Sequence, residues 1–122
     1  MAQIIKEPSI IKAAGNKEKI IQEFFGRVNT KTSEISIAKM NSPQGWEEPG
    51  QRPEFYEYTI VLKGTLRIKT MKDEYAVSEG QAILVSENEW VQYSTPFEGG
   101  AEYLAICLPA FSPEIVHRDK TD

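Results

Sequence analysis

Hydrophobic and polar positions along this chain form short segments, and the clearest of them is residues 57–62, Glu-Tyr-Thr-Ile-Val-Leu. Aromatic, β-branched and aliphatic side chains fill this segment after its first residue. Lys63-Gly64 follows, and residues 65–69 then alternate polar and apolar side chains. An apolar strand, a turn containing glycine and an alternating strand predict a β-hairpin. Because its first strand is apolar on both faces, we expect it to lie in the middle of the structure.

Similar patterns predict strands on both sides of the hairpin. In a strand over residues 33–40, Ile35 and Ile37 would share one face. Residues 17–25 fit either a helical stripe or a strand, and the short length of the segment favours a strand. Later strands are expected over residues 74–77, 81–85, 90–94 and 102–108.

The two ends of the chain predict simpler elements. Residues 1–15 suggest an extended arm with one short strand, which could lie along a neighbouring subunit. Ser112-Pro113-Glu114 is a favourable helix start, so residues 112–122 are expected to form a short C-terminal helix through about His117 and then a charged tail. Many short strands separated by turns predict an all-β jelly roll, with residues 1–122 forming a single domain.

Composition narrows the possible functions. A net charge of -4 and scattered Lys and Arg argue against a nucleic-acid surface. No apolar run is long enough to span a membrane and the N-terminus lacks a signal-peptide pattern, so we expect a soluble, cytoplasmic protein without a membrane partner. The lone Cys107 excludes an internal disulfide and a cysteine-based zinc knuckle, and its apolar surroundings predict a core position.

Two stretches resemble the sequence motifs of the cupin superfamily. Glu57 and Gly64 have the six-residue spacing that ends the first motif, and Gly80 with residues 81–85 looks like the beginning of the second. The closing Cys-Leu-Pro-Ala-Phe at 107–111 is similar to that of small single-domain, RmlC-like cupins. The resemblance covers roughly residues 34–111 and implies a cupin-type jelly-roll β-barrel.

The metal-binding histidines of that family have no counterpart here. Their positions fall on Gly50 and Arg52 or, with the shorter spacing, on Gln51 and Pro53, and in the second motif on Val91. Of the family's four ligand positions, only Glu57 remains. Because iron, manganese and zinc need three or four converging ligands, we expect no metal and no cofactor.

Glu57 is the first candidate for a functional residue. On an inner wall it could bind a cationic or hydroxylated ligand or, if burial raised its pKa, act as a base. It could equally be a structural carboxylate that pairs with Arg52 or a tyrosine. Strand alternation would turn Thr59 and Val61 inward with Glu57 and leave Tyr58, Ile60 and Leu62 on an outer apolar face. That face needs cover, which predicts a homodimer.

Other candidates lie near the predicted mouth of the barrel. Tyr93 is the one phenol expected on the inner face of the strand over residues 90–94, Arg52 could clamp a carboxylate, and Trp46 could stack on a ligand. For Arg52 and Trp46 we favour the simpler interpretation, a solvated charge and a packing aromatic. The candidate ligand-binding residues are Trp46, Gln51, Arg52, Glu54 and Tyr93. His117 is the only histidine and, lacking a placed partner, the weaker candidate for a catalytic base.

These residues support alternative functions. The first is a metal-independent cupin that binds a small organic molecule as a binding or sensing module. The second is an isomerase, epimerase or lyase acting on a sugar or small acid, with Glu57 or His117 as general base. A third is a metal-dependent cupin with Gln51, Glu54 and Glu57 as unusual ligands. Glu57→Gln should abolish turnover in an enzyme, whereas ligand binding could survive it.

Overall fold

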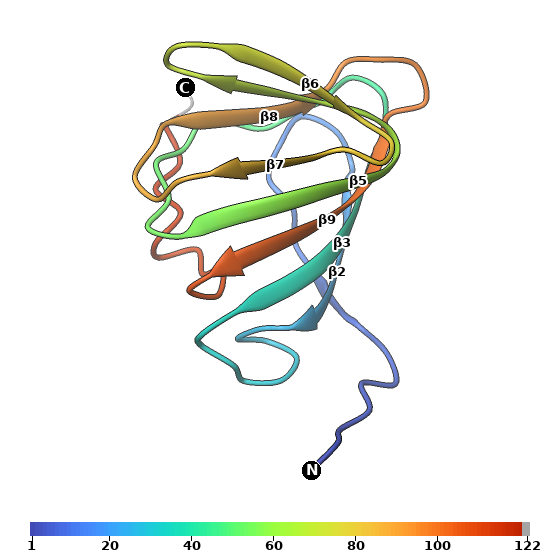
Figure 1. The fold of residues 1–122 in the computed structure, drawn as a ribbon, viewed down its shortest axis with the longest axis vertical. Coiled ribbons are helices and arrows are strands. Elements are labelled where there is room, and N and C mark those ends of the chain that lie inside the picture. The colour runs from blue at the N-terminus through green and yellow to red at the C-terminus, as the bar shows by residue number, and fades with distance from the viewer. Residues whose placement is uncertain (121–122) are drawn as a thin grey trace.

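A computed structural model describes residues 1–120 and consists of one curled antiparallel β-sheet, so the all-β prediction is confirmed (Figure 1). Its strands are β1 (Ser9–Ile11), β2 (Ile20–Phe25), β3 (Ser36–Ser42), β4 (Trp46–Glu47), β5 (Tyr56–Thr70), β6 (Glu74–Ser78), β7 (Ala82–Val85), β8 (Val91–Thr95) and β9 (Ala101–Leu108). Their order is β1-β2-β3-β9-β5-β8-β4, with β6 and β7 also paired to β5. The curl produces a half-barrel with a concave inner face.

β5 joins the two halves of this sheet. It runs for 15 residues, and its first half pairs with β7 and β9 while its second half pairs with β6 and β8. The predicted hairpin over residues 57–69 is therefore wrong. The chain continues past Lys63-Gly64 as one strand, and the two predicted hairpin strands pair with other partners instead of with each other.

The backbone at Gly64 explains this difference. Gly64 has a φ of 75°, and the register against β9 shifts between Val61 and Lys63. A local irregularity of this kind bends a strand without reversing it. A Cβ atom at Gly64 would lie 2.1 Å from the carbonyl oxygen of Gly100. The close approach of these two backbones therefore requires glycine at position 64.

The N-terminal region contains the one short strand that was expected. This strand, β1, pairs with β2 of the same chain, and β2 confirms that residues 20–25 form a strand. The residues before β1 extend away from the half-barrel (Figure 1). Within residues 1–120, no helix is long and apolar enough to cross a membrane.

The predicted C-terminal helix is wrong. Ser112 does cap a turn, because the backbone N–H of Glu114 donates to its Oγ at 3.2 Å. After this turn, however, residues 115–119 run alongside residues 50–54 and share backbone hydrogen bonds with them. Val116 is 2% exposed and packs in a small apolar cluster. A single turn does not nucleate a helix on its own, so this pairing and packing determine the conformation. Residues 121–122 of the expected tail lie outside the described part.

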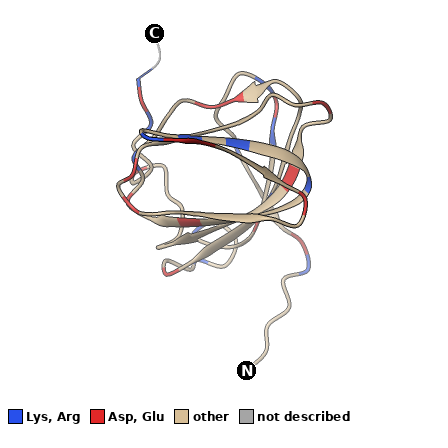
Figure 2. Ribbon diagram, turned by 45° about the horizontal axis from the view of Figure 1, so that its top comes forward, with Lys and Arg blue, Asp and Glu red and all other residues tan. Residues whose placement is uncertain are grey.

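The faces of β5 follow the predicted alternation. In its first half Thr59 and Val61 are each 1% exposed, whereas Tyr58, Ile60 and Leu62 are 38–42% exposed on the outer side. In its second half Leu66 and Ile68 are completely buried in the main apolar core. Basic and acidic residues are interspersed over the ribbon (Figure 2).

Candidate functional site

The inner face of the half-barrel lines a partly open cavity of about 70 Å³. The first half of β5, together with β2, β3, β8 and β9, supplies part of its wall, and the segments that precede β2 and follow β4 and β9 supply the rest. Aromatic and aliphatic side chains cover much of this wall. Its polar groups include Lys19, Glu48, Gln51, Glu57, Tyr93 and Arg118.

Glu57 lies near the beginning of β5 and points inward, as its alternation with Thr59 requires. Burial raises the pKa of its carboxyl group to about 7, and the nearby Glu48 carboxylate acts in the same direction. The Lys19 ammonium, the Tyr93 hydroxyl and the Arg118 guanidinium partly oppose this rise. Glu57 therefore exchanges a proton with its surroundings near neutral pH.

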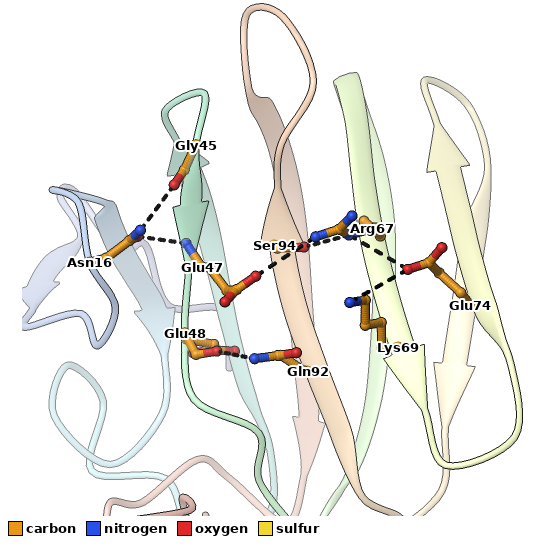
Figure 3. Close-up of polar contacts among 9 residues, drawn as sticks. All are labelled: Asn16, Gly45, Glu47, Glu48, Arg67, Lys69, Glu74, Gln92 and Ser94. Carbon is orange, nitrogen blue, oxygen red and sulfur yellow. Dashed lines mark hydrogen bonds and ion pairs between the residues drawn. The ribbon is translucent and has the colours of Figure 1, made fainter. Parts of the chain in front are cut away.

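Glu48 faces the same cavity from the segment that follows β4 and is 8% exposed. Its backbone is fixed against β8, since Gln92 Nε2 donates to the Glu48 carbonyl oxygen at 3.1 Å (Figure 3). Burial also raises the pKa of the Glu48 carboxyl group, while Lys19 and Arg118 oppose the rise. Two carboxyl groups thus share a poorly solvated space.

Lys19 enters the cavity from the segment that links β1 to β2. Its Nζ lies 4.0 Å from the ring centroid of Trp46 and 5.3 Å from that of Tyr103, within cation–π range. Burial lowers the pKa of Lys19, but Tyr103 and the Glu48 carboxylate outweigh it, so the net pKa is raised. Lys19 is therefore an ammonium ion. Its segment is anchored by Asn16, which donates to the Gly45 carbonyl and accepts from the Glu47 N–H (Figure 3).

Arg118 reaches the cavity because the C-terminal segment is extended. The backbone N–H of Arg52 donates to the carbonyl of His117 at 3.1 Å, and Gln51 forms an isolated β-bridge with Arg118. Gln51 is 3% exposed and is bridged on its other side to Val91 in β8. One backbone arrangement thus carries both Gln51 and Arg118 to the cavity wall.

Several of these polar groups lack direct partners. Among residues 1–120, Gln51 Oε1, Tyr93 Oη and Arg118 Nε are buried and have no hydrogen-bond partner within the protein. The Tyr93 hydroxyl lies near enough to Glu57 to lower the pKa of its carboxyl group, although the two do not meet the geometry of a hydrogen bond. In the same described range, no ion pair within 4.0 Å joins the two basic groups to Glu48 or Glu57. A buried polar group without a partner costs about 1–3 kcal/mol.

Three of the candidates from sequence, Gln51, Glu57 and Tyr93, come together here. Trp46 does not line the cavity: it is 1% exposed in the core, and its Nε1 donates to the Ala14 carbonyl at 3.0 Å. Its ring instead supports Lys19. Arg52 is exposed, with Nη1 3.5 Å from the Asn88 carbonyl oxygen.

Glu54 and His117 lie together at the surface, away from the cavity wall. His117 Nε2 and Glu54 Oε2 are 2.5 Å apart, and their side chains are 51% and 53% exposed. Gln51, Glu54 and Glu57 therefore do not converge as the metal-dependent alternative requires. Within the described residues, no group of three or more His, Cys, Asp or Glu side chains could hold a metal ion.

Sequence reasoning missed Lys19, Glu48 and Arg118. Lys19 precedes an apolar strand and resembles an ordinary solvated charge, whereas Arg118 lay in the predicted helix and tail. Glu48 had a usable signal, because it belongs to the long loop over residues 41–53 in which function was expected.

The chain is a small all-β domain with the polar cavity described above. Comparison with solved structures identifies its fold. An RmlC-like cupin from Shewanella frigidimarina matches with a TM-score of 0.72 and 14% identity, over 93% of this chain and 94% of that one. The polyketide cyclase RemF from Streptomyces resistomycificus matches with a TM-score of 0.75 and 16% identity, over 100% and 87%. Bacillus subtilis oxalate decarboxylase matches with a TM-score of 0.77 and 15% identity, over 93% of this chain and 30% of that one. The chain has the cupin fold.

Sequence comparison gives a different kind of match. No family model matches this chain. It is 42% identical over 101 residues, or 83% of its length, to Endoribonuclease YbeY of Myxococcus xanthus (strain DK1622). The chain spans 34% of the length of that relative, so the name of the relative describes a much longer protein.

Proposed function

We propose that this cupin-fold protein binds a small organic molecule in its interior cavity, without a metal ion. The observation that supports the proposal is the convergence of Gln51 Oε1, Tyr93 Oη and Arg118 Nε, three buried polar atoms without hydrogen-bond partners, on one cavity. Each of these atoms comes from a different part of the chain. A molecule that completes their hydrogen bonds recovers the cost of leaving them unpaired.

The test is a thermal-shift screen with small acids, amines, amino acids and polyols at millimolar concentration. A molecule that binds only the folded protein raises its melting temperature. Tyr93→Phe removes one cavity hydroxyl and should reduce the shift for the best compound. Tyr58→Phe is the matched control, because Tyr58 lies on the outer face and is 42% exposed. If no compound stabilises the wild-type protein, the proposal fails.

Proton-transfer catalysis is a second candidate function, and the state of Glu57 favours it. A carboxyl group with a pKa of about 7 that faces a cavity is suited to accept and return a proton at neutral pH. This candidate corresponds to an isomerase, epimerase or lyase that acts on a small acid or sugar. His117 does not line the cavity and therefore is not assigned this role.

Deuterium exchange tests this second function whatever the exact reaction is. Each compound that binds is incubated with protein in D₂O, and loss of its carbon-bound proton signals is followed by NMR. Glu57→Gln should abolish enzyme-dependent exchange, whereas His117→Gln should leave it unchanged. Exchange that persists in the Glu57→Gln protein would remove Glu57 as the base.

We also propose that the protein is a homodimer formed through the outer face of the first half of β5. Leu84, Tyr58, Ile106 and Ile37 lie side by side in the register of β7, β5, β9 and β3, giving a continuous apolar row across four strands. Two-fold interfaces place the same patch on both subunits, so they suit an apolar row without charges of one sign. A second copy of this chain is therefore the occupant that we propose.

Light scattering after size-exclusion chromatography measures the mass directly. At micromolar concentration we expect about twice the 13.8 kDa of one chain. Ile60→Glu should yield the single-chain mass because it places a charge in the middle of the face. A wild-type protein that elutes as a monomer would rule out the dimer.

The Myxococcus relative is an endoribonuclease by name, and this chain matches 34% of its length. We propose that the shared segment is its ligand-binding domain and that cleavage of RNA belongs to the remaining sequence. This chain has a net charge of -4 and one histidine, a poor set of groups for holding and cutting RNA. Purified protein should leave a labelled RNA intact; specific cleavage, lost in the Glu57→Gln variant, would refute this division.

A further inference from the structure

The geometry of the cavity points to a particular class of ligand: a zwitterion about as large as the smallest α-amino acids, with one ammonium and one carboxylate group. This inference rests on the proposed binding function and specifies what binds. Three features of the cavity support it, namely its size, the arrangement of its charges and the polar atoms left without partners.

The size of the cavity limits the ligand. Its volume is about 70 Å³. On this measure one water molecule needs roughly 10–15 Å³, so the cavity holds about five or six water-sized groups. A ligand of about five or six non-hydrogen atoms fills it.

The charges of the cavity determine the electrostatic character of the ligand. Glu23, Glu48 and Glu57 line the cavity together with Lys12, Lys19 and Arg118. Glu23 already accepts from the backbone N–H groups of Val28 and Asn29, which leaves Glu48 and Glu57 facing Lys19 and Arg118. A dicarboxylate would be repelled by Glu48 and Glu57 when these are ionised, and a diamine by the two basic groups. Water screens such repulsion only weakly in a buried space. A ligand with one charge of each sign interacts favourably with both pairs.

Lys19 is held so that it does not neutralise the glutamates directly. Its Nζ lies over the Trp46 ring at 4.0 Å, and no ion pair within 4.0 Å joins it to Glu48 or Glu57 among residues 1–120. Trp46 is itself fixed by its hydrogen bond to the Ala14 carbonyl. Lys19 therefore forms no direct ion pair with either glutamate, which leaves these charges available to a ligand that carries both signs.

The unpartnered atoms require a ligand that both donates and accepts hydrogen bonds. Arg118 Nε can only donate, Gln51 Oε1 can only accept, and Tyr93 Oη can do either. A carboxylate accepts from Arg118 and Tyr93, and an ammonium group donates to Gln51 and to a glutamate. Phe55, Phe111 and Ala105 add an apolar part to the wall, which suits a hydrogen or methyl side chain.

Four compounds with the same carbon skeleton and six non-hydrogen atoms test the inference by calorimetry on the wild-type protein. Alanine carries both charges, lactate only the carboxylate, alaninamide only the ammonium group and lactamide neither. We expect alanine to bind at least tenfold more tightly than any of the other three. Equal or tighter binding of lactate, alaninamide or lactamide would overturn the inference that the ligand is a zwitterion, while leaving the proposed binding function intact.

Substitution of Glu48 tests the same point from the protein side. Glu48→Gln should weaken alanine binding at least tenfold and leave lactate binding unchanged or tighter, because alanine, unlike lactate, carries an ammonium group. Glu47→Gln is the matched control: the adjacent residue lies outside the cavity, with a side chain that is 49% exposed, and should change neither affinity. An alanine affinity unchanged by Glu48→Gln would overturn the inference. If nothing in this set or the wider screen binds, the proposed function fails as well.

Discussion

Charged side chains on the outer face of the second half of β5 are arranged in the opposite way to those that line the cavity beside its first half. Outside, Arg67 Nε donates to Ser94 Oγ at 3.0 Å, and its guanidinium lies 3.7–3.9 Å from Glu47 and Glu74 (Figure 3). Lys69 lies 3.8 Å from the same Glu74. Inside, Lys19 and Arg118 form no ion pair within 4.0 Å with Glu48 or Glu57 in the described residues.

This difference is the reverse of what stability alone would favour. Exposed ion pairs such as those of Arg67 contribute roughly 0–1 kcal/mol each, because water screens them. Charges removed from water cost several kcal/mol unless they are paired. The chain thus forms ion pairs where they contribute little, and leaves Lys19 and Arg118 without one in the cavity, where burial raises the pKa values of Glu48 and Glu57. The ligand binding that we propose would account for this interior arrangement.

The largest predicted change in stability comes from disturbing the bend at Gly64, between the two halves of β5. Gly64→Ala should lower the free energy of unfolding by roughly 2–5 kcal/mol, since left-handed strain and overpacking add together. The added Cβ would lie 2.1 Å from the Gly100 carbonyl oxygen at a φ of 75°. Urea denaturation measures the change.

Gly99 provides the matched control for that substitution. It has a similar φ of 81°, but no atom lies within 4 Å of the position of an added Cβ. Gly99→Ala should therefore cost only about 1 kcal/mol, from backbone strain alone. Equal losses in the two variants would show that the contact with Gly100 does not fix the bend.

The second largest predicted effect is a dependence of folding stability on pH, which arises from Glu57 in the cavity. Folding raises the pKa of Glu57 from its ordinary 4.5 to about 7, so the folded state binds this proton more tightly than the unfolded state. The resulting stabilisation is complete below pH 4.5 and is lost as the pH rises to about 7. The loss is on the order of 3 kcal/mol.

Glu57→Gln should remove this dependence, because glutamine does not ionise. We expect the variant to match the wild-type protein near pH 4.5 and to be more stable at about pH 8. Urea denaturation of both proteins at these two pH values gives the difference directly. A variant that is less stable than the wild-type protein at the higher pH would mean that the Glu57 carboxylate is well paired in the fold.

The smallest effect belongs to the outer ion pairs. Lys69→Gln should lower the free energy of unfolding by less than about 0.5 kcal/mol, and the difference should disappear in high salt. The same denaturation experiment with and without added salt measures it. A loss above about 1 kcal/mol, unaffected by salt, would contradict the contrast between outside and inside.

Much of the fold could be predicted because strand alternation is a local property. It correctly placed Thr59 and Val61 inside and Tyr58 outside, and it located most of the strands. The bend at Gly64 could not be read in this way, because it depends on the backbone of Gly100, distant in sequence. The C-terminal segment likewise depends on pairing with residues 50–54, which no local helix signal contains.

The site was predictable only where a motif or strand pattern marked it. Glu57 and Gln51 came from the motif positions, and Tyr93 from the alternation of its strand. Lys19 and Arg118 belong to connecting and terminal segments that approach the cavity only after the sheet has curled. Their charges have no local pattern that distinguishes them from solvated surface residues.

A crystal structure of the protein soaked with alanine at neutral pH would decide whether the interior charges form a binding site. We predict one bound molecule inside the half-barrel, with its carboxylate at Arg118 Nε and Tyr93 Oη and its ammonium group at Gln51 Oε1. The contradicting result is a cavity without the ligand, in which Lys19 and Arg118 form direct ion pairs with Glu48 and Glu57. The interior charges would then be a structural cluster, not a binding site.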